Sequence, residues 1–184
     1  MTESRSRTQN HPERPRKLWD RDPGLAALLP VRPETSVPWE GGRRLRDWWY
    51  AARADRLMPA WRDFSPRAMG RWLSGVIVFR VVGGSDEPDF IVRLAGEDYR
   101  RTAGTGLKGQ ALAVFPDAEP IRARFLWALA HRLPYMALDL PSHWAGKDFV
   151  RFRSLVVPLG DECGRVDHLV GHAHYFIARN GPRR

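Results

Sequence analysis

Two apolar segments near the middle of the sequence are separated by a short run of turn-forming residues. Residues 75–82 read GVIVFRVV and residues 89–94 read DFIVRL, and both are rich in the β-branched and aromatic side chains that favour strands. The run GGSD at 83–86 between them is typical of a tight turn. The pattern therefore predicts a β-hairpin, and with it a sheet that is antiparallel at this point.

After the hairpin the pattern changes from strand to helix periodicity and then returns. Residues 96–101 predict one or two helical turns, and residues 119–132 predict a longer helix with apolar side chains on one side and arginines on the other. Further strands are predicted at 134–140, 148–159 and 169–177, the last two joined by a loop at 161–167. Two strands before the helices and three after them predict an α+β fold, in which helices cover one face of an antiparallel five-stranded sheet.

An amphipathic helix is predicted before the hairpin. Residues 42–57 place large apolar side chains at helical spacing, with arginines between them. A second, short helix is indicated by Asp63 and Ser65 as N-cap residues and by Pro66 at a first-turn position. Because their apolar stripes must be buried, we expect both helices to form a cap on the sheet domain.

These patterns divide the chain into four parts. Residues 1–22 are mainly polar, and prolines are spaced along the segment that follows them. We therefore expect a disordered arm and a Pro-rich linker at 1–41, cap helices at 42–74, the sheet domain at 75–178 and a basic tail at 179–184.

The chain is strongly basic and contains a single cysteine. Its formal net charge is +9, but all except three of its 30 basic residues are arginine, a bias that a GC-rich genome produces without selection for binding. Because Cys163 is the only cysteine, an internal disulfide and a Cys-rich metal site are excluded. The N-terminus carries no apolar run, and no stretch approaches the roughly 20 apolar residues of a membrane span. We expect a cytoplasmic protein.

Three stretches of the sequence resemble one protein family, in the same order. They are WWYAARADRLMPAWRDFSP at 48–66, DFIVRLAGEDYRRTAGTGLKGQ at 89–110 and RSLVVPLGDECGRVDHLVG at 153–171. The family is a bacterial group of single PAS domains that was first catalogued as a domain of unknown function, and the resemblance covers about residues 43–178. The chain departs from the family at Glu97, where threonine is common.

The resemblance implies a five-stranded antiparallel sheet with a central pocket between the sheet and the helices, and a role in signal input or protein association. We expect a stand-alone sensory or interaction module that binds a small ligand or a signalling protein and acts by forming a homodimer or docking a partner. The sequence contains no motif-defined catalytic constellation, so we do not expect an enzyme. No cofactor is predicted.

Four residues are candidate ligand contacts. Arg93 lies in an otherwise apolar strand, where a charge must reach water or find a partner. It either binds an anionic ligand through a bidentate pair, or it forms an ion pair with Glu97 or Asp98 or lies under the cap. The residues expected beside it on the pocket side are Tyr99, Trp127 and Arg153.

Histidines are concentrated near the end of the chain. The segment HLVGHAH places His168, His172 and His174 on one face of a strand, with the last two about 6.5 to 7 Å apart. His172 and His174 are weak candidates for metal ligands, since no third ligand is specified; the alternative is a sheet face packed under the cap. His131 lies in the long helix, where haem-binding PAS domains have an axial ligand, but a histidine at a helix C-terminus also suits the macrodipole.

Tryptophan and arginine are common in binding hot spots, which makes Trp48, Trp49, Arg53 and Trp61 candidate residues of a dimer or partner interface. The alternative is a cap that buries its own aromatic side chains.

A second class of function is binding of nucleic acid or an anionic surface through arginine side chains. The arginines concerned are Arg43, Arg44, Arg46, Arg53 and Arg56 of the predicted helix and the terminal Arg183 and Arg184.

Overall fold

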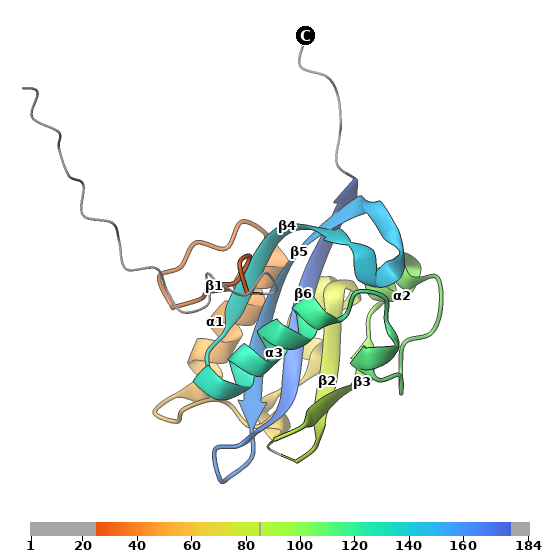
Figure 1. Cartoon of the computed structure of the whole chain (residues 1–184). Coiled ribbons are helices and arrows are strands. Elements are labelled where there is room, and N and C mark those ends of the chain that lie inside the picture. Colours follow the sequence, from red (N-terminus) through yellow and green to blue (C-terminus); the bar gives the residue numbers. More distant parts are fainter. Residues whose placement is uncertain (1–24, 85, 178–184) are drawn as a thin grey trace, which may run out of the picture.

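An antiparallel sheet forms the centre of the protein (Figure 1). The computed structural model describes residues 25–84 and 86–177, and over these residues the sheet has six strands in the order β1-β4-β5-β6-β2-β3. The strands are β1 (Leu29–Pro30), β2 (Val76–Gly83), β3 (Pro88–Ala95), β4 (Tyr135–Ser142), β5 (Lys147–Gly160) and β6 (Val166–Ile177). The α+β class is confirmed, and so is the predicted hairpin, which is formed by β2 and β3.

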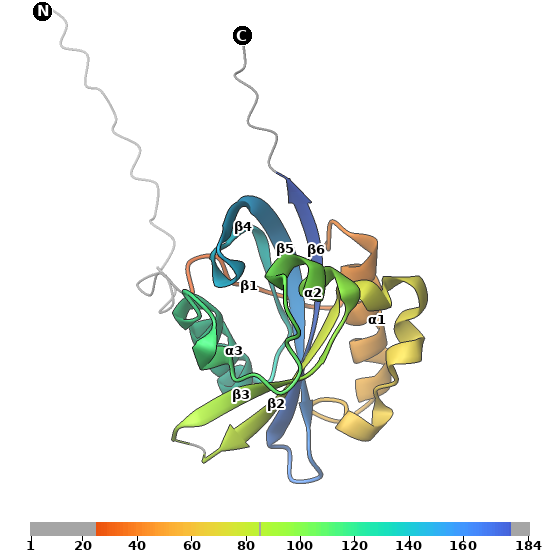
Figure 2. The same ribbon diagram turned by 90° about the vertical axis from the view of Figure 1, so that its right-hand side faces the viewer.

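Helices lie on both sides of the sheet (Figure 2). α3 (Glu119–His131) packs on one face, and α1 (Glu40–Arg53) packs against β5 and β6 on the other face, beside η3 (Pro66–Gly75). The remaining helices are α2 (Glu97–Ala103) and the short 3-10 helices η2 (Trp61–Asp63), η4 (Leu112–Val114) and η5 (His143–Ala145). This arrangement confirms the expected cap of N-terminal helices.

The strand β1 corrects the expectation of five strands. It pairs with β4 at the edge of the sheet, where Pro30 is tolerated although it lacks a backbone N–H. The apolar residues around it are buried, namely Leu28, Val31, Val37 and Trp39. The described part of the expected Pro-rich linker therefore packs onto the domain and contributes to its core.

The cap helices differ from the predictions in their bounds. α1 begins at Glu40 and ends at Arg53, earlier than predicted, because Ala54 has a φ of 49° that a right-handed helix does not allow. η3 begins at Pro66 as predicted, but it is a 3-10 helix that is interrupted at Gly70. The predicted arm at 1–22 and tail at 179–184 lie outside the described residues.

Alternation along the strands separates two sets of side chains. Ser154 and Val156 of β5 line a central cavity, and Tyr175 of β6 lines it too. Leu155 of β5 and His172 of β6 have the opposite parity and are buried on the side of α1. One face of these strands therefore lines the cavity, and the other face packs against the cap.

Two indole groups hold the cap against the sheet. The Nε1 of the buried Trp49 donates a hydrogen bond to the Pro158 carbonyl oxygen at 2.7 Å. The Nε1 of Trp39 donates to Nδ1 of His172 at 3.1 Å. The first turn of α1 comes so near that a Cβ added to Gly41 would lie 2.1 Å from the His172 ring. Glycine at this position permits that close approach.

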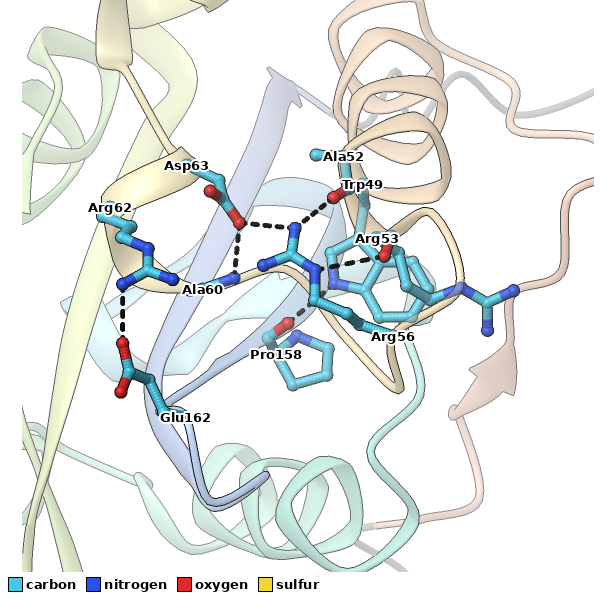
Figure 3. A network of polar contacts seen from close by, with 9 residues as sticks. All are labelled: Trp49, Ala52, Arg53, Arg56, Ala60, Arg62, Asp63, Pro158 and Glu162. Atoms are coloured by element: carbon cyan, nitrogen blue, oxygen red, sulfur yellow. Dashed lines mark hydrogen bonds and ion pairs between the residues drawn. The ribbon is translucent and has the colours of Figure 1, made fainter.

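A network of polar contacts follows the C-terminal end of α1 (Figure 3). One carboxylate oxygen of Asp63 accepts the backbone N–H of Ala60 at 2.8 Å and pairs with Arg56 at 2.7 Å. Arg62 pairs with Glu162 of the β5–β6 loop at 2.7 Å. Burial opposes ionisation of Asp63, but the Ala60 hydrogen bond and the Arg56 charge outweigh it and lower the pKa of the carboxyl. The network connects the end of α1, η2 and the β5–β6 loop.

Candidate functional site

A central cavity of about 60 Å³ lies between the sheet and the helices on the α3 side. Its walls are mainly aromatic and aliphatic, with a few polar groups among them, as is usual in sites for small molecules. The aromatic walls include Phe79, Phe115, Phe125, Trp144 and Phe152. The polar groups are those of Tyr99, Arg124, Tyr135, Ser154 and Tyr175.

Arg124 places a cation in the cavity wall. It lies on α3, three residues after Ile121 and one before Phe125, which line the same cavity. Only 6% of Arg124 is exposed. Burial lowers the pKa of its guanidinium, and the Tyr135 hydroxyl, within hydrogen-bonding reach, acts in the opposite direction. A guanidinium presents five N–H donors in a planar fork that matches the geometry of a carboxylate or phosphate.

Three tyrosines bring hydroxyl groups to the cavity from different elements. Tyr99 comes from α2, Tyr135 from the start of β4 and Tyr175 from β6. The rings of Tyr99 and Tyr175 meet edge to face with 5.5 Å between their centroids. Burial raises the pKa of all three hydroxyls, so they stay protonated at neutral pH and can donate hydrogen bonds as well as accept them.

The structure places one of the four predicted ligand contacts in the cavity lining, and this residue is Tyr99. Trp127 is buried on α3, but the described lining does not include it. Its ring stacks on His131, with 4.4 Å between the centroids. Whether Tyr99 binds a ligand stays a prediction.

The described cavity lining does not include the two predicted arginine contacts, Arg93 and Arg153. The guanidinium of Arg93 is exposed and lies 5.0 Å from the ring centroid of Trp61, which agrees with the alternative placement beside the cap. Arg153 pairs with Asp139 at 3.1 Å. Since its neighbour Ser154 faces the cavity, alternation in β5 turns Arg153 to the opposite face.

The sequence did not reveal four polar residues of the lining, which are Arg124, Tyr135, Ser154 and Tyr175. Arg124 was missed because charged side chains were assigned to the solvent side of the helix. Helical spacing contains a signal for its position. Residue 124 follows the cavity residue Ile121 by three positions and precedes Ala128, which is fully buried, by four. Side chains at such spacings share one face of a helix.

A family model described as PAS domain matches residues 39–174, which include α1, β2 to β5 and most of β6. The chain belongs to the PAS domain family. No curated protein matches it. Membership assigns this PAS domain the general role of a sensory or interaction module.

The candidate interface residues of the PAS domain contact their own chain. Trp49 is 0% exposed, so it is part of the core and not of a surface. Trp48 and Trp61 are half-buried, and Trp61 stacks on His168 with 4.3 Å between ring centroids. Arg53 lies 5.6 Å from the ring centroid of Trp49. Whether Trp48, Arg53 and Trp61 contact a partner stays a prediction.

The three histidines predicted to share one strand face of the PAS domain differ in their burial. His168 and His172 are buried on the cap side, whereas His174 is exposed. Burial is the main cause that lowers the pKa of His172 to about 4. Within residues 25–84 and 86–177, no three His, Cys, Asp or Glu side chains are grouped so that they could hold a metal ion.

His131 and the single cysteine lie outside the described cavity lining. His131 is exposed at the end of α3, with Nδ1 2.9 Å from the Trp127 carbonyl oxygen. Cys163 is exposed in the β5–β6 loop.

Across the described residues, no helix has the length and apolar character required to cross a membrane.

Most arginines of the α1 region contact neighbouring parts of the PAS domain. Hydrogen bonds or ion pairs join Arg43 to Val37, Arg44 to Ala68, Arg46 to Thr35 and Arg56 to Asp63. These contacts hold the cap in place, which gives the arginines a structural role. Arg183 and Arg184 lie outside the described residues.

Proposed function

We propose that this PAS domain senses a small molecule in its central cavity. It transmits the binding signal by associating with a second copy or with a signalling protein. The observation that carries the proposal is the cavity, in which polar groups are buried among aromatic walls. Protein cores are normally close-packed, so a cavity among core side chains departs from ordinary packing. A cavity with a few convergent polar groups is the usual form of a ligand site.

The sheet offers a route from the cavity to the cap. β5 and β6 contact α1 with one face and line the cavity with the other. Ser154 faces the cavity, while the adjacent Leu155 is buried on the side of α1. A displacement of these strands by a ligand therefore reaches the cap, where Trp48 and Trp61 are the proposed contacts to a partner.

Native mass spectrometry of the freshly purified protein tests both parts of the proposal. We expect a retained small molecule and the mass of a dimer or of a complex with another protein. A Ser154→Leu variant fills the cavity and is expected to lose the molecule. The same change at an exposed position, Ser65→Leu, serves as the control and should leave retention unchanged.

Ligand binding should also raise Tm, since a molecule that binds the folded state stabilises it by mass action. Retention of the same molecule by a folded Ser154→Leu variant would show that the cavity is not the site. An empty wild-type protein whose Tm no metabolite raises would contradict sensing. A ligand-bound protein that stays monomeric and captures no partner would contradict output by association.

A further inference from the structure

The polar groups of the cavity indicate the chemical class of its ligand, an inference that rests on the proposed function. We infer that the cavity takes a small uncharged molecule with one hydrogen-bonding group. That group pairs with the hydroxyl of Ser154, and the rest of the molecule lies against the aromatic walls.

The charged residue of the described lining is already engaged by the protein itself. Arg124 has the Tyr135 hydroxyl within hydrogen-bonding reach, and it makes a further interaction within the protein. A charged ligand would have to displace these contacts or be buried without a partner. Because burying an unpaired charge is strongly unfavourable, the engaged guanidinium favours an uncharged ligand.

Two tyrosines of the lining are engaged with one another. The rings of Tyr99 and Tyr175 meet edge to face, and their hydroxyls interact, although not in the geometry of a regular hydrogen bond. The Tyr175 oxygen is fully enclosed, so a ligand in the cavity does not reach it. The interactions of this pair therefore lie within the protein.

The hydroxyl of Ser154 differs, because the protein gives it no partner. Ser154 lines the cavity from β5 and is 9% exposed, and its side chain makes no hydrogen bond within residues 25–84 and 86–177. A buried hydroxyl without a partner is unfavourable, and a ligand that forms a hydrogen bond with it removes this penalty. Since a hydroxyl both donates and accepts, the carbonyl oxygen of a ketone or the hydroxyl of an alcohol fits it.

The size of the cavity limits the ligand to a few atoms. About 10–15 Å³ of such volume accommodates one water molecule, so the cavity of about 60 Å³ takes about four to six non-hydrogen atoms. Short ketones and alcohols are within this range. Their alkyl groups leave water when they bind against the apolar walls, which favours binding.

A second hollow, of about 150 Å³, adjoins the cavity and indicates how a ligand reaches it. Its lining includes the exposed Asp117, whereas the described lining does not include Ser154. Apart from Arg124, the residues that both spaces share are Ile121, Trp144 and Phe152. A ligand therefore passes large apolar side chains before it meets the hydroxyl, which favours a molecule that loses little hydration.

Four probes of one shape test the inference by titration of the ¹⁵N-labelled protein, followed by NMR at neutral pH and fixed ionic strength. Butanone, 2-methyl-1-butene, propionate and sec-butylammonium have the same number and branching of non-hydrogen atoms. We expect butanone to bind most tightly and 2-methyl-1-butene to bind more weakly, because it lacks the oxygen. The two ions should bind at least about tenfold more weakly than butanone.

A variant of the serine tests the hydrogen bond itself. Ser154→Ala should weaken butanone binding about three- to tenfold and leave the binding of 2-methyl-1-butene unchanged. Ser142→Ala makes the same change at a buried serine outside the described lining and should bind both probes like the wild type. If Ser154→Ala does not fold, Ser154→Cys replaces it. Its thiol is a weak hydrogen-bonding group, so the same loss is expected for butanone alone.

Propionate or sec-butylammonium that binds as tightly as butanone would overturn the uncharged class. Undiminished butanone binding by Ser154→Ala, or an equal loss of butanone and 2-methyl-1-butene, would overturn the hydrogen bond. Both results would leave a small-molecule site in the cavity. Failure of the wild type to bind any of the probes would also overturn the inference, and the native mass spectrum then decides the proposed function separately.

Discussion

His172 is enclosed between the cap and the sheet, with 5% of its surface exposed. Its Nδ1 accepts the Trp39 indole N–H, and Gly41 lies directly beside the ring. Burial lowers its pKa to about 4, and the nearby charge of Asp98, which favours protonation, does not offset this effect. His174 has the same parity on β6 but is exposed. Alternation along the strand therefore placed the two histidines on one face, although their surroundings differ.

We expect the free energy of unfolding to decrease as the pH falls from 6.5 toward 4. In this window the unfolded chain protonates His172, whose ordinary pKa is 6.5, while the folded chain does not until about pH 4. This difference in pKa contributes about 3 kcal/mol to the free energy of unfolding. The contribution is fully present above pH 6.5, and it is lost as the pH falls to about 4, the pKa of His172 in the folded state. Urea unfolding at several pH values measures it. His172→Gln should lack this pH dependence and His174→Gln should retain it, whereas equal slopes for His172→Gln and the wild type would refute the assignment.

Elements with a repeated pattern were predictable from the sequence, and elements without one were not. β2, β3, β5, β6 and α3 begin and end within a few residues of the predicted ranges, because each is long enough to leave an apolar run or a helical pattern between turn-forming residues. β1 has two residues and therefore no period. The early end of α1 depends on the backbone at Ala54, a residue type that ordinarily favours helix.

The network at the end of α1 allows a test of how the cap is held (Figure 3). Asp63→Ala removes both the acceptor for the Ala60 N–H and the partner of Arg56. We expect it to lower the free energy of unfolding by about 1–2 kcal/mol. Asp55→Ala removes an exposed carboxylate nearby and should change it by less than about 0.5 kcal/mol. Urea unfolding at neutral pH compares them, and equal small losses would mean that the network does not stabilise the cap.

Contacts between distant segments determine the parts of the site that the sequence did not reveal. Arg124 is buried because its side of α3 meets the cavity beside Tyr135. Arg153 was expected at the pocket but lies on the other face of β5. Strand periodicity defines which residues share a face but not which face meets the cavity. Tyr99 was expected on the pocket side from its position in the sequence alone, and it lines the cavity. The fold was therefore more predictable than the identity of the polar groups within the cavity.

The start of the folded domain also depends on a long-range contact, and two adjacent leucines test it. Leu28 is 3% exposed and Leu29 is 43% exposed, in the segment that the sequence presented as a linker. If the segment is part of the core, Leu28→Ala leaves a void and should lower the free energy of unfolding by about 2–4 kcal/mol. Leu29→Ala should cost less than about 1 kcal/mol. Urea unfolding measures both losses, and an unchanged m-value shows that the same structure unfolds. A Leu28→Ala loss no larger than that of Leu29→Ala would mean that the segment is a linker after all.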